Sequence, residues 1–388
     1  MEPENEPVSP TAPPTNVSEP ALAPQASEPV ADEKPYRGLK WIFVGGQGLR
    51  AGWSVLVFFV LFVALNIGVG MAMFRAHLVG RTPELTPRGA FWSEAGGLFS
   101  LIIAAFLVAL IERRRVMDYN LAGPRRPRNF FLGLAIGFLA LSALIGGLAA
   151  GGWLHLGHSA MSGAAILRFG ILWGCVFLMV GCAEEGLMRC YLLFTLTRGI
   201  NFWWALGIVL LACGDLALRA HGSHGSAVWG VYAAALLGVA PCFLLQQRRS
   251  PGNGFWNAAW VTSTLFGFAH VGNPGEAWIG IFAAAFIGFV FCVSVRVTGS
   301  AWWAIGCHAG WDWGETYFYG TADSGLTPHG SFLTSTPAGN ALWSGGAVGP
   351  EGSLLAIGVV LLLLAVVLIY GRMGGSQRPA HAAPQAAD

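Results

Sequence analysis

The chain has 388 residues, of which 54% are hydrophobic and only 11% are charged, whereas an average soluble domain is about 25% charged. The formal net charge of +2 is too small to indicate a nucleic-acid-binding protein. This composition excludes an ordinary soluble domain, and we predict a protein that lies mostly in lipid.

Residues 1–35 are rich in Pro, Glu, Ala and Ser and contain no apolar run. Such a segment cannot bury enough surface to offset the entropy of ordering, so it is predicted to be a disordered tail. An arginine-rich stretch over 113–128 follows the second apolar run. Because cytoplasmic loops carry an excess of Arg and Lys, this stretch predicts a multi-pass protein of the cell membrane with a cytoplasmic N-terminus.

Apolar runs recur from Ala51 to Tyr370, and most approach the ~20 residues that a helix needs to cross a bilayer. Their many glycines and alanines suit close helix packing in lipid. We count ten runs, with eight as the lower bound: about 51–74, 96–111, 130–154, 165–198, 202–217, 228–245, 255–270, 277–295, 301–313 and 354–370. The predicted fold is an all-α, polytopic transmembrane helical bundle.

This reading divides the chain into six parts. After the tail over 1–35 come N-terminal transmembrane helices over 36–165, a transmembrane core over 166–318, an exposed loop rich in Gly, Ser and Thr over 319–352, a C-terminal span over 353–373 and a polar tail over 374–388. The seven cysteines lie in or beside apolar segments without a CxxC pair. They are predicted to be small buried hydrophobic residues.

Ionisable side chains inside spans cost roughly 2.5–3.5 kcal/mol each, so each of them is a candidate for function. The first group is Glu184, Glu185 and Arg189. Glu185 and Arg189 are four residues apart on one helix face, which favours an ion pair. Adjacent helical residues differ by about 100°, so Glu184 is predicted to be free to act as a general base.

Two further groups lie on later apolar segments. Phe266 and His270 are four residues apart, as are His308 and Asp312. With a rise of ~1.5 Å per residue, Glu184, His270 and His308 lie at depths of roughly 21, 22 and 18 Å, in one layer. The alternative is that each polar pair only holds helices together. This alternative is disfavoured because all three groups lie in one layer. Glu315, one turn beyond Asp312, is a reserve candidate.

The ordered motifs EExxxR, FxxxH and HxxxD on successive hydrophobic helices resemble the CAAX-processing and bacteriocin-immunity membrane proteases, over about Phe169–Phe318. The resemblance implies a type II CAAX endopeptidase-like fold, in which Glu184, His270 and His308 line a membrane cavity and hydrolyse a peptide bond. This sequence has about fifty additional residues, interpreted as an extra helical hairpin over 212–257.

Asp312 also departs from the family, because the eukaryotic CAAX proteases have asparagine at this point. An ionised aspartate cannot donate a hydrogen bond to an oxyanion. Asp312 is therefore expected to be protonated, to orient His308 or to bind a metal ion.

The leading hypothesis is an intramembrane endopeptidase in which Glu184 and His270 activate a water molecule, while His308 and Asp312 stabilise the oxyanion. Glu184, His270 and His308 also match a catalytic zinc site, and a metal-free mechanism is the equal alternative. Expected partners are membrane lipid and a peptide or lipidated-protein substrate. The rival functions are a non-catalytic membrane protein that confers bacteriocin immunity and a proton-coupled transporter.

Overall fold

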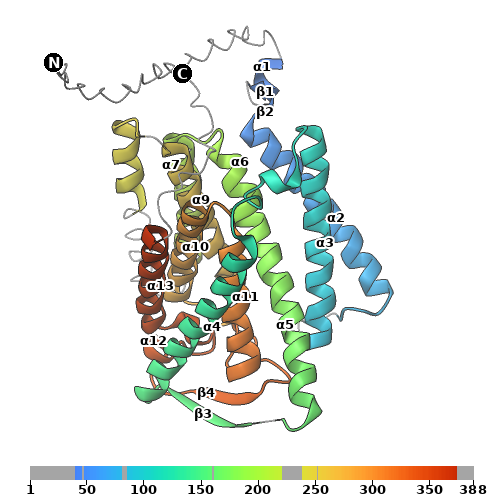
Figure 1. The fold of residues 1–388 in the computed structure, drawn as a ribbon, viewed down its shortest axis with the longest axis vertical. Coiled ribbons are helices and arrows are strands. Elements are labelled where there is room, and N and C mark those ends of the chain that lie inside the picture. Colours follow the sequence, from blue (N-terminus) through green and yellow to red (C-terminus); the bar gives the residue numbers. More distant parts are fainter. Residues whose placement is uncertain are drawn as a thin grey trace, which may run out of the picture.

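The computed structural model describes residues 40–45, 48–80, 85–159, 161–220, 238–250 and 252–373. The predicted tails over 1–35 and 374–388 lie outside these residues, as does 221–237 within the predicted extra hairpin. The described chain is a bundle of helices with two small antiparallel strand pairs at its ends (Figure 1).

The elements follow in chain order. They are α1 Lys40–Phe43, β1 Val44–Gly45, β2 Gly48–Leu49, α2 Ala51–Arg75, α3 Pro87–Ile111, a 3₁₀ turn Val116–Asp118, α4 Arg126–Ala150, β3 Leu154–Ser159, α5 Ala164–Glu185, a π-helix Gly186–Leu192, α6 Leu193–Thr197, α7 Phe202–Ala220, helical residues 238–247, α9 Asn253–Ala269, a 3₁₀ turn His270–Gly272, α10 Trp278–Thr298, α11 Trp302–Asp312, a π-helix Trp313–Tyr319, β4 Leu333–Pro337, α12 Ala341–Ser344, a 3₁₀ turn Pro350–Gly352 and α13 Leu354–Met373.

Six helical segments in the described chain are long and apolar enough to cross a membrane: α2, α3, α4, the continuous helix Ala164–Thr197, α10 and α13. Large apolar side chains such as Val60 and Ile67 on α2 are 61% and 57% exposed, as expected where lipid is the solvent. The four other predicted runs are also helical where the structure describes them, at α7, 238–247, α9 and α11. The predicted all-α membrane fold is confirmed, and a count of eight to ten spans stays a prediction.

Two predicted span boundaries are wrong. The second span begins at Pro87 instead of Gly96, because Thr86 Oγ1 accepts a hydrogen bond from Gly89 N at 3.2 Å and caps the helix. The third span ends at Ala150 instead of Leu154. Gly152 turns the chain with φ at 74°, and strand β3 begins at Leu154.

The prediction of a simple exposed loop over 319–352 is also wrong. In this segment, here called the end segment, β4 pairs with β3 across one end of the bundle (Figure 1). Thr321 and Val348 are each only 2% exposed. The small residues that resemble a solvent-exposed loop in the sequence instead let the backbone fold back closely on the helices, as at Gly349 with φ at 117°.

Helices α4 and α11 are in direct backbone contact through small residues. A methyl group on Gly137 would overlap the carbonyl oxygen of Cys307, and one on Gly310 would overlap that of Leu134. The glycines repeat every four residues on each helix, as in the small-xxx-small motif of membrane helices; they are Gly133, Gly137, Gly306 and Gly310. This contact fixes the position of α11.

We expect Gly137→Ala to lower the thermal unfolding temperature of the protein in detergent by several degrees. The added methyl group has no space against α11, and overpacking costs about 1–3 kcal/mol. Gly146→Ala on the same helix is the matched control, because nothing lies within 4 Å of a Cβ at Gly146. Equal unfolding temperatures for the two variants would contradict the packing.

Candidate active site

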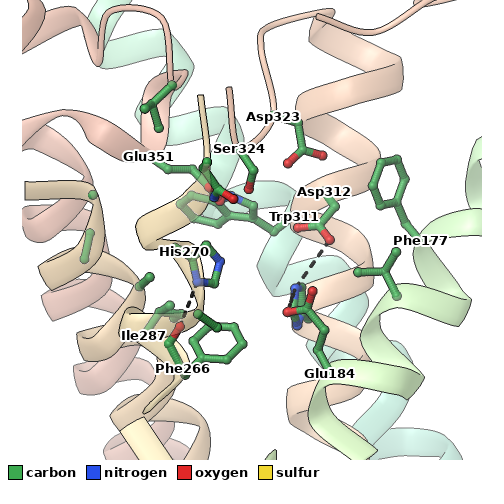
Figure 2. A pocket seen from close by; sticks show the side chains of 18 of the residues that line it. Phe177, Glu184, Phe266, His270, Ile287, Trp311, Asp312, Asp323, Ser324 and Glu351 are labelled. Atoms are coloured by element: carbon green, nitrogen blue, oxygen red, sulfur yellow. Dashed lines mark hydrogen bonds and ion pairs between the residues drawn. The ribbon is translucent and has the colours of Figure 1, made fainter. Parts of the chain in front are cut away.

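A cavity of about 540 Å³ lies among the helices, towards the end of the bundle that carries the end segment. It is lined by Glu184, His270, His308 and Asp312, four of the predicted site residues. In Figure 2, Glu184 and Asp312 lie on one side of the pocket and His270 lies on the other. The structure thus brings residues far apart in the sequence to one site.

His308 lies at the centre of the acidic groups. Its Nδ1 donates a hydrogen bond to Glu185 Oε1 at 2.9 Å. Its Nε2 lies 3.4 Å from Asp312 Oδ2 and 3.7 Å from Glu184 Oε2. Helix α11 supplies His308 and Asp312 from one face, and the end of α5 supplies both glutamates. Carboxylates therefore approach the imidazole at both of its ring nitrogens.

Glu185 has a second role that the sequence did not predict. The expected ion pair is present, since Arg189 Nε lies 3.2 Å from Glu185 Oε2 and both side chains are 0% exposed. Glu185, which the sequence predicted as a site residue through its pair with Arg189, also binds His308. Although neighbouring helical residues point about 100° apart, one imidazole ring presents nitrogens on two sides and meets both carboxylates.

Arg189 is held by aromatic rings as well as by Glu185. Its guanidinium carbon lies 4.3 Å from the ring centre of Phe266 and 5.3 Å from that of Phe291. Such cation–π contacts favour a desolvated guanidinium. Phe266, the first residue of the predicted FxxxH motif, therefore packs against the cation that neutralises Glu185.

The two adjacent glutamates have opposite environments. The side chain of Glu184 is 43% exposed and that of Glu185 is fully buried. A π-helix begins directly after Glu185, and a second one begins directly after Asp312. Short π-helices are frequent at functional sites. Here they alter the direction of the chain beside both acidic groups.

His270 caps the end of α9, and its Nδ1 lies 2.8 Å from the carbonyl oxygen of Phe266. A carbonyl oxygen can only accept, so Nδ1 carries the hydrogen of this bond. In the neutral ring, Nε2 is then an acceptor. The ring of Phe266 lies 5.0 Å from that of His270 and 6.1 Å from that of His308, so it lies near both histidines.

Three carboxyl groups that line the pocket were missed by the sequence analysis: Glu94, Asp323 and Glu351. Thr86 followed by Pro87 is a signal for the start of a helix, and its use would have placed Glu94 inside the second span. Asp323 and Glu351 belong to the end segment. Burial raises the pKa of the Asp323 carboxyl, and burial together with the Asp323 charge raises the pKa of Glu351 to about 7.

The predicted zinc ligands do not close around one ion in this structure. Glu184, His270 and His308 all line the pocket, but they are not a group of three ligand atoms within 4.8 Å of one another. Among the described residues, the set that meets this distance is Glu315, Asp323 and Glu351. The proposed chemistry therefore uses the glutamate and histidine side chains alone.

The fold and the pocket define a multi-pass helical membrane protein with a polar site of carboxylates and histidines among its spans. Residues 242–314 match the family model described as type II CAAX prenyl endopeptidase Rce1-like. This match confirms the resemblance to the CAAX-processing and bacteriocin-immunity membrane proteases, and it supports a CAAX-type intramembrane endopeptidase at the level of the family. The matched residues include His270 and His308 but not the EExxxR motif. No curated protein and no solved structure matches the chain.

The neighbouring glutamates should differ in their effect on stability. Glu185→Gln leaves the buried guanidinium of Arg189 without its counter-charge, and breaking a buried pair in this way costs about 3–5 kcal/mol. We expect a large fall in the thermal unfolding temperature and in the yield of folded protein. Glu184→Gln is the matched control, because its half-exposed side chain has no such partner to support. Similar unfolding temperatures for the two variants would contradict the assigned roles.

Proposed function

We propose that the chain is an intramembrane endopeptidase in which Glu184 activates a water molecule against a peptide carbonyl group. The observation that carries this proposal is the arrangement around His308. Glu185 holds one ring nitrogen at 2.9 Å, and the other faces Asp312 and the exposed Glu184. A positioned imidazole beside a carboxylate that water can reach is suited to general acid–base catalysis. The family match supports the same reaction class.

In the first step, a water molecule between the two walls of the pocket donates one hydrogen bond to Glu184 and one to His270 Nε2. Glu184 takes the proton as the water oxygen bonds to the carbonyl carbon of the substrate. When the tetrahedral intermediate collapses, the carbon–nitrogen bond breaks and protonated Glu184 returns the proton to the leaving amine. Glu184 is the group for this task because its side chain is 43% exposed, whereas Glu185 is buried.

His308 stabilises the oxyanion in this mechanism. With Nδ1 donating to Glu185, a protonated His308 also donates from Nε2, and this second N–H faces the pocket. A preorganised donor of this kind stabilises charge that develops in the transition state. Of the three roles open to Asp312, the 3.4 Å separation from His308 Nε2 favours orientation of the ring before substrate binds; the substrate oxyanion then takes the Nε2 hydrogen.

The substrate proposed for this pocket is a membrane-associated peptide or lipidated protein. Away from the polar groups the lining is apolar, and α10 and α13 contribute part of it, for example Ala283, Ile287 and Val360. Apolar residues or a lipid chain beside the cleaved bond would bury hydrophobic surface there.

We expect Glu184→Gln to lower peptide cleavage about 10²–10⁴-fold, the usual contribution of a general base. The assay uses full-length protein reconstituted in lipid with prenylated and unprenylated peptides, and Asp118→Asn at the opposite end of the bundle is the control. The absence of cleavage of either peptide by the wild type would reject both as substrates. Protection against a peptide toxin that survives Glu184→Gln would favour the rival immunity function.

The orientation proposed for the chain follows from its basic residues. Contacts join the ends of several helices at one end of the bundle: Arg198 after α6 pairs with Glu112 after α3 at 2.9 Å, and Arg128 of α4 lies over the ring of Tyr370 of α13. The arginine-rich stretch over 113–128 lies at the same end. The positive-inside rule makes this end cytoplasmic. The end segment and the polar part of the pocket then face the other side of the membrane.

We expect a cysteine at Thr327 to react with a membrane-impermeant thiol reagent on intact cells. Thr327 is exposed in the end segment, and Ala122 is exposed in the arginine-rich loop. Ala122→Cys should react only after the membrane is permeabilised, and the unsubstituted protein gives the background from the native cysteines. The reverse labelling pattern would contradict the proposed orientation.

A further inference from the structure

A second group of acidic side chains lies beside the pocket and has no part in the proposed mechanism. Glu315 lies on the π-helix that continues α11, Asp323 lies in the end segment, and Glu351 lies in the 3₁₀ turn before α13. One carboxylate oxygen of each lies within 4.8 Å of the others. Three elements that are separated along the chain thus each place one carboxylate at the same point.

Glu315 is the member that points to a ligand. It is 0% exposed, and its Oε1 has no hydrogen-bond partner. Its other oxygen, Oε2, accepts a hydrogen bond from Trp311 Nε1 at 3.0 Å, and the same N–H donates to Glu351 Oε1 at 2.8 Å. A buried carboxylate oxygen without a partner costs stability unless something positive or hydrogen-bonding reaches it.

Among the described residues, His270 and His308 are the basic neighbours that favour the charged forms of Asp323 and Glu351. None of the three carboxylates is paired with a lysine or arginine in the described part of the chain. Asp323 receives hydrogen bonds from neutral hydroxyl groups, one of them from Thr316 Oγ1 at 2.6 Å. Burial raises the pKa of both Asp323 and Glu351, and a neighbouring carboxylate adds to the rise in each case: Glu184 for Asp323, and Asp323 for Glu351. A cation among them would remove this repulsion.

We propose that Glu315, Asp323 and Glu351 bind a divalent cation, for which Ca²⁺ has the best fit, and that the ion fastens the end segment to α11 beside the pocket. Three carboxylates favour a hard cation over zinc or copper. Two oxygens on one Ca²⁺, with bonds of about 2.3–2.6 Å, lie at most about 4.6–5.2 Å apart, and for Mg²⁺ this limit is about 4.0–4.2 Å. The three oxygens lie within 4.8 Å of one another, a separation that one Ca²⁺ ion can bridge.

The site would hold one wall of the pocket in place. Asp323 and Glu351 line the pocket, as do Ser324 and Val348 of the same segment. The ion would connect this wall to Glu315, one turn beyond Asp312 on the continuous helix of α11. The proposal does not depend on proteolysis, because the ion binds residues that take no part in the proposed chemistry.

Ca²⁺ binding is tested on purified full-length protein in detergent, after treatment with a chelator and its removal. We expect CaCl₂, added up to a few millimolar, to raise the thermal unfolding temperature, because a ligand that binds only the folded state stabilises it. Calorimetric titration should give one ion per chain. Glu351→Gln and Asp323→Asn should each lower the Ca²⁺ affinity at least about tenfold, because affinity follows the charge of the ligands. Neither readout needs protease activity, so loss of cleavage and loss of Ca²⁺ binding are distinguishable.

Both variants should fold without the ion, since each removes one of three repelling charges. Glu276→Gln is the matched control, because Glu276 is another part-buried carboxylate that lines the pocket but lies outside the group. It should keep the Ca²⁺-dependent rise in unfolding temperature. The proposal is overturned if Ca²⁺ gives no rise in the wild type, if Glu351→Gln shows the same rise, or if Mg²⁺ stabilises the protein and Ca²⁺ does not.

Discussion

A charged side chain inside the hydrocarbon region needs an opposite charge within the protein. In this chain Glu185 and Arg189 neutralise each other. The pair is fully buried, with Nε and Oε2 3.2 Å apart. Glu185 also binds His308 on α11, and Arg189 lies against Phe266 on α9. One ion pair on the α5 segment thus connects the helices that carry all three predicted motifs. A change to this pair alters stability and site geometry together.

The close packing of α4 and α11 depends on small residues at their contact. Without the hydrophobic effect to draw helices together in lipid, close contact supplies van der Waals attraction and requires small residues. Gly137 lies against the backbone of Cys307, which immediately precedes His308. The backbone that carries the histidine is therefore fixed by a contact on its far side, while the imidazole is fixed by carboxylates on the pocket side. Both contacts limit the freedom of the ring.

The sequence predicted the contents of the site better than its geometry. The constant rise of a helix along its axis let residue counts place Glu184, His270 and His308 at one depth. Rotation about the axis was less predictable, because the π-helix after Glu185 changes the number of residues per turn and has no clear composition signal. Glu94 was missed because the predicted second span began too late, at Gly96. Asp323 and Glu351 were missed because their burial comes from tertiary contacts. Gly, Ser and Thr resemble a solvent-exposed loop until the surface that they pack against is known.

The contrast between Glu184 and Glu185 fits the proposed division between one catalytic and one structural carboxylate. A carboxylate that must stay charged while buried needs fixed partners, and Glu185 has two of them, Arg189 and His308. A carboxylate that exchanges protons with water needs access to water and no permanent cation, and Glu184 is 43% exposed at 3.7 Å from His308. Because adjacent helical residues point in different directions, the end of α5 turns one carboxylate into the protein and the other into the pocket. In the proposed mechanism this chain therefore uses two glutamates, because neither environment suits both tasks.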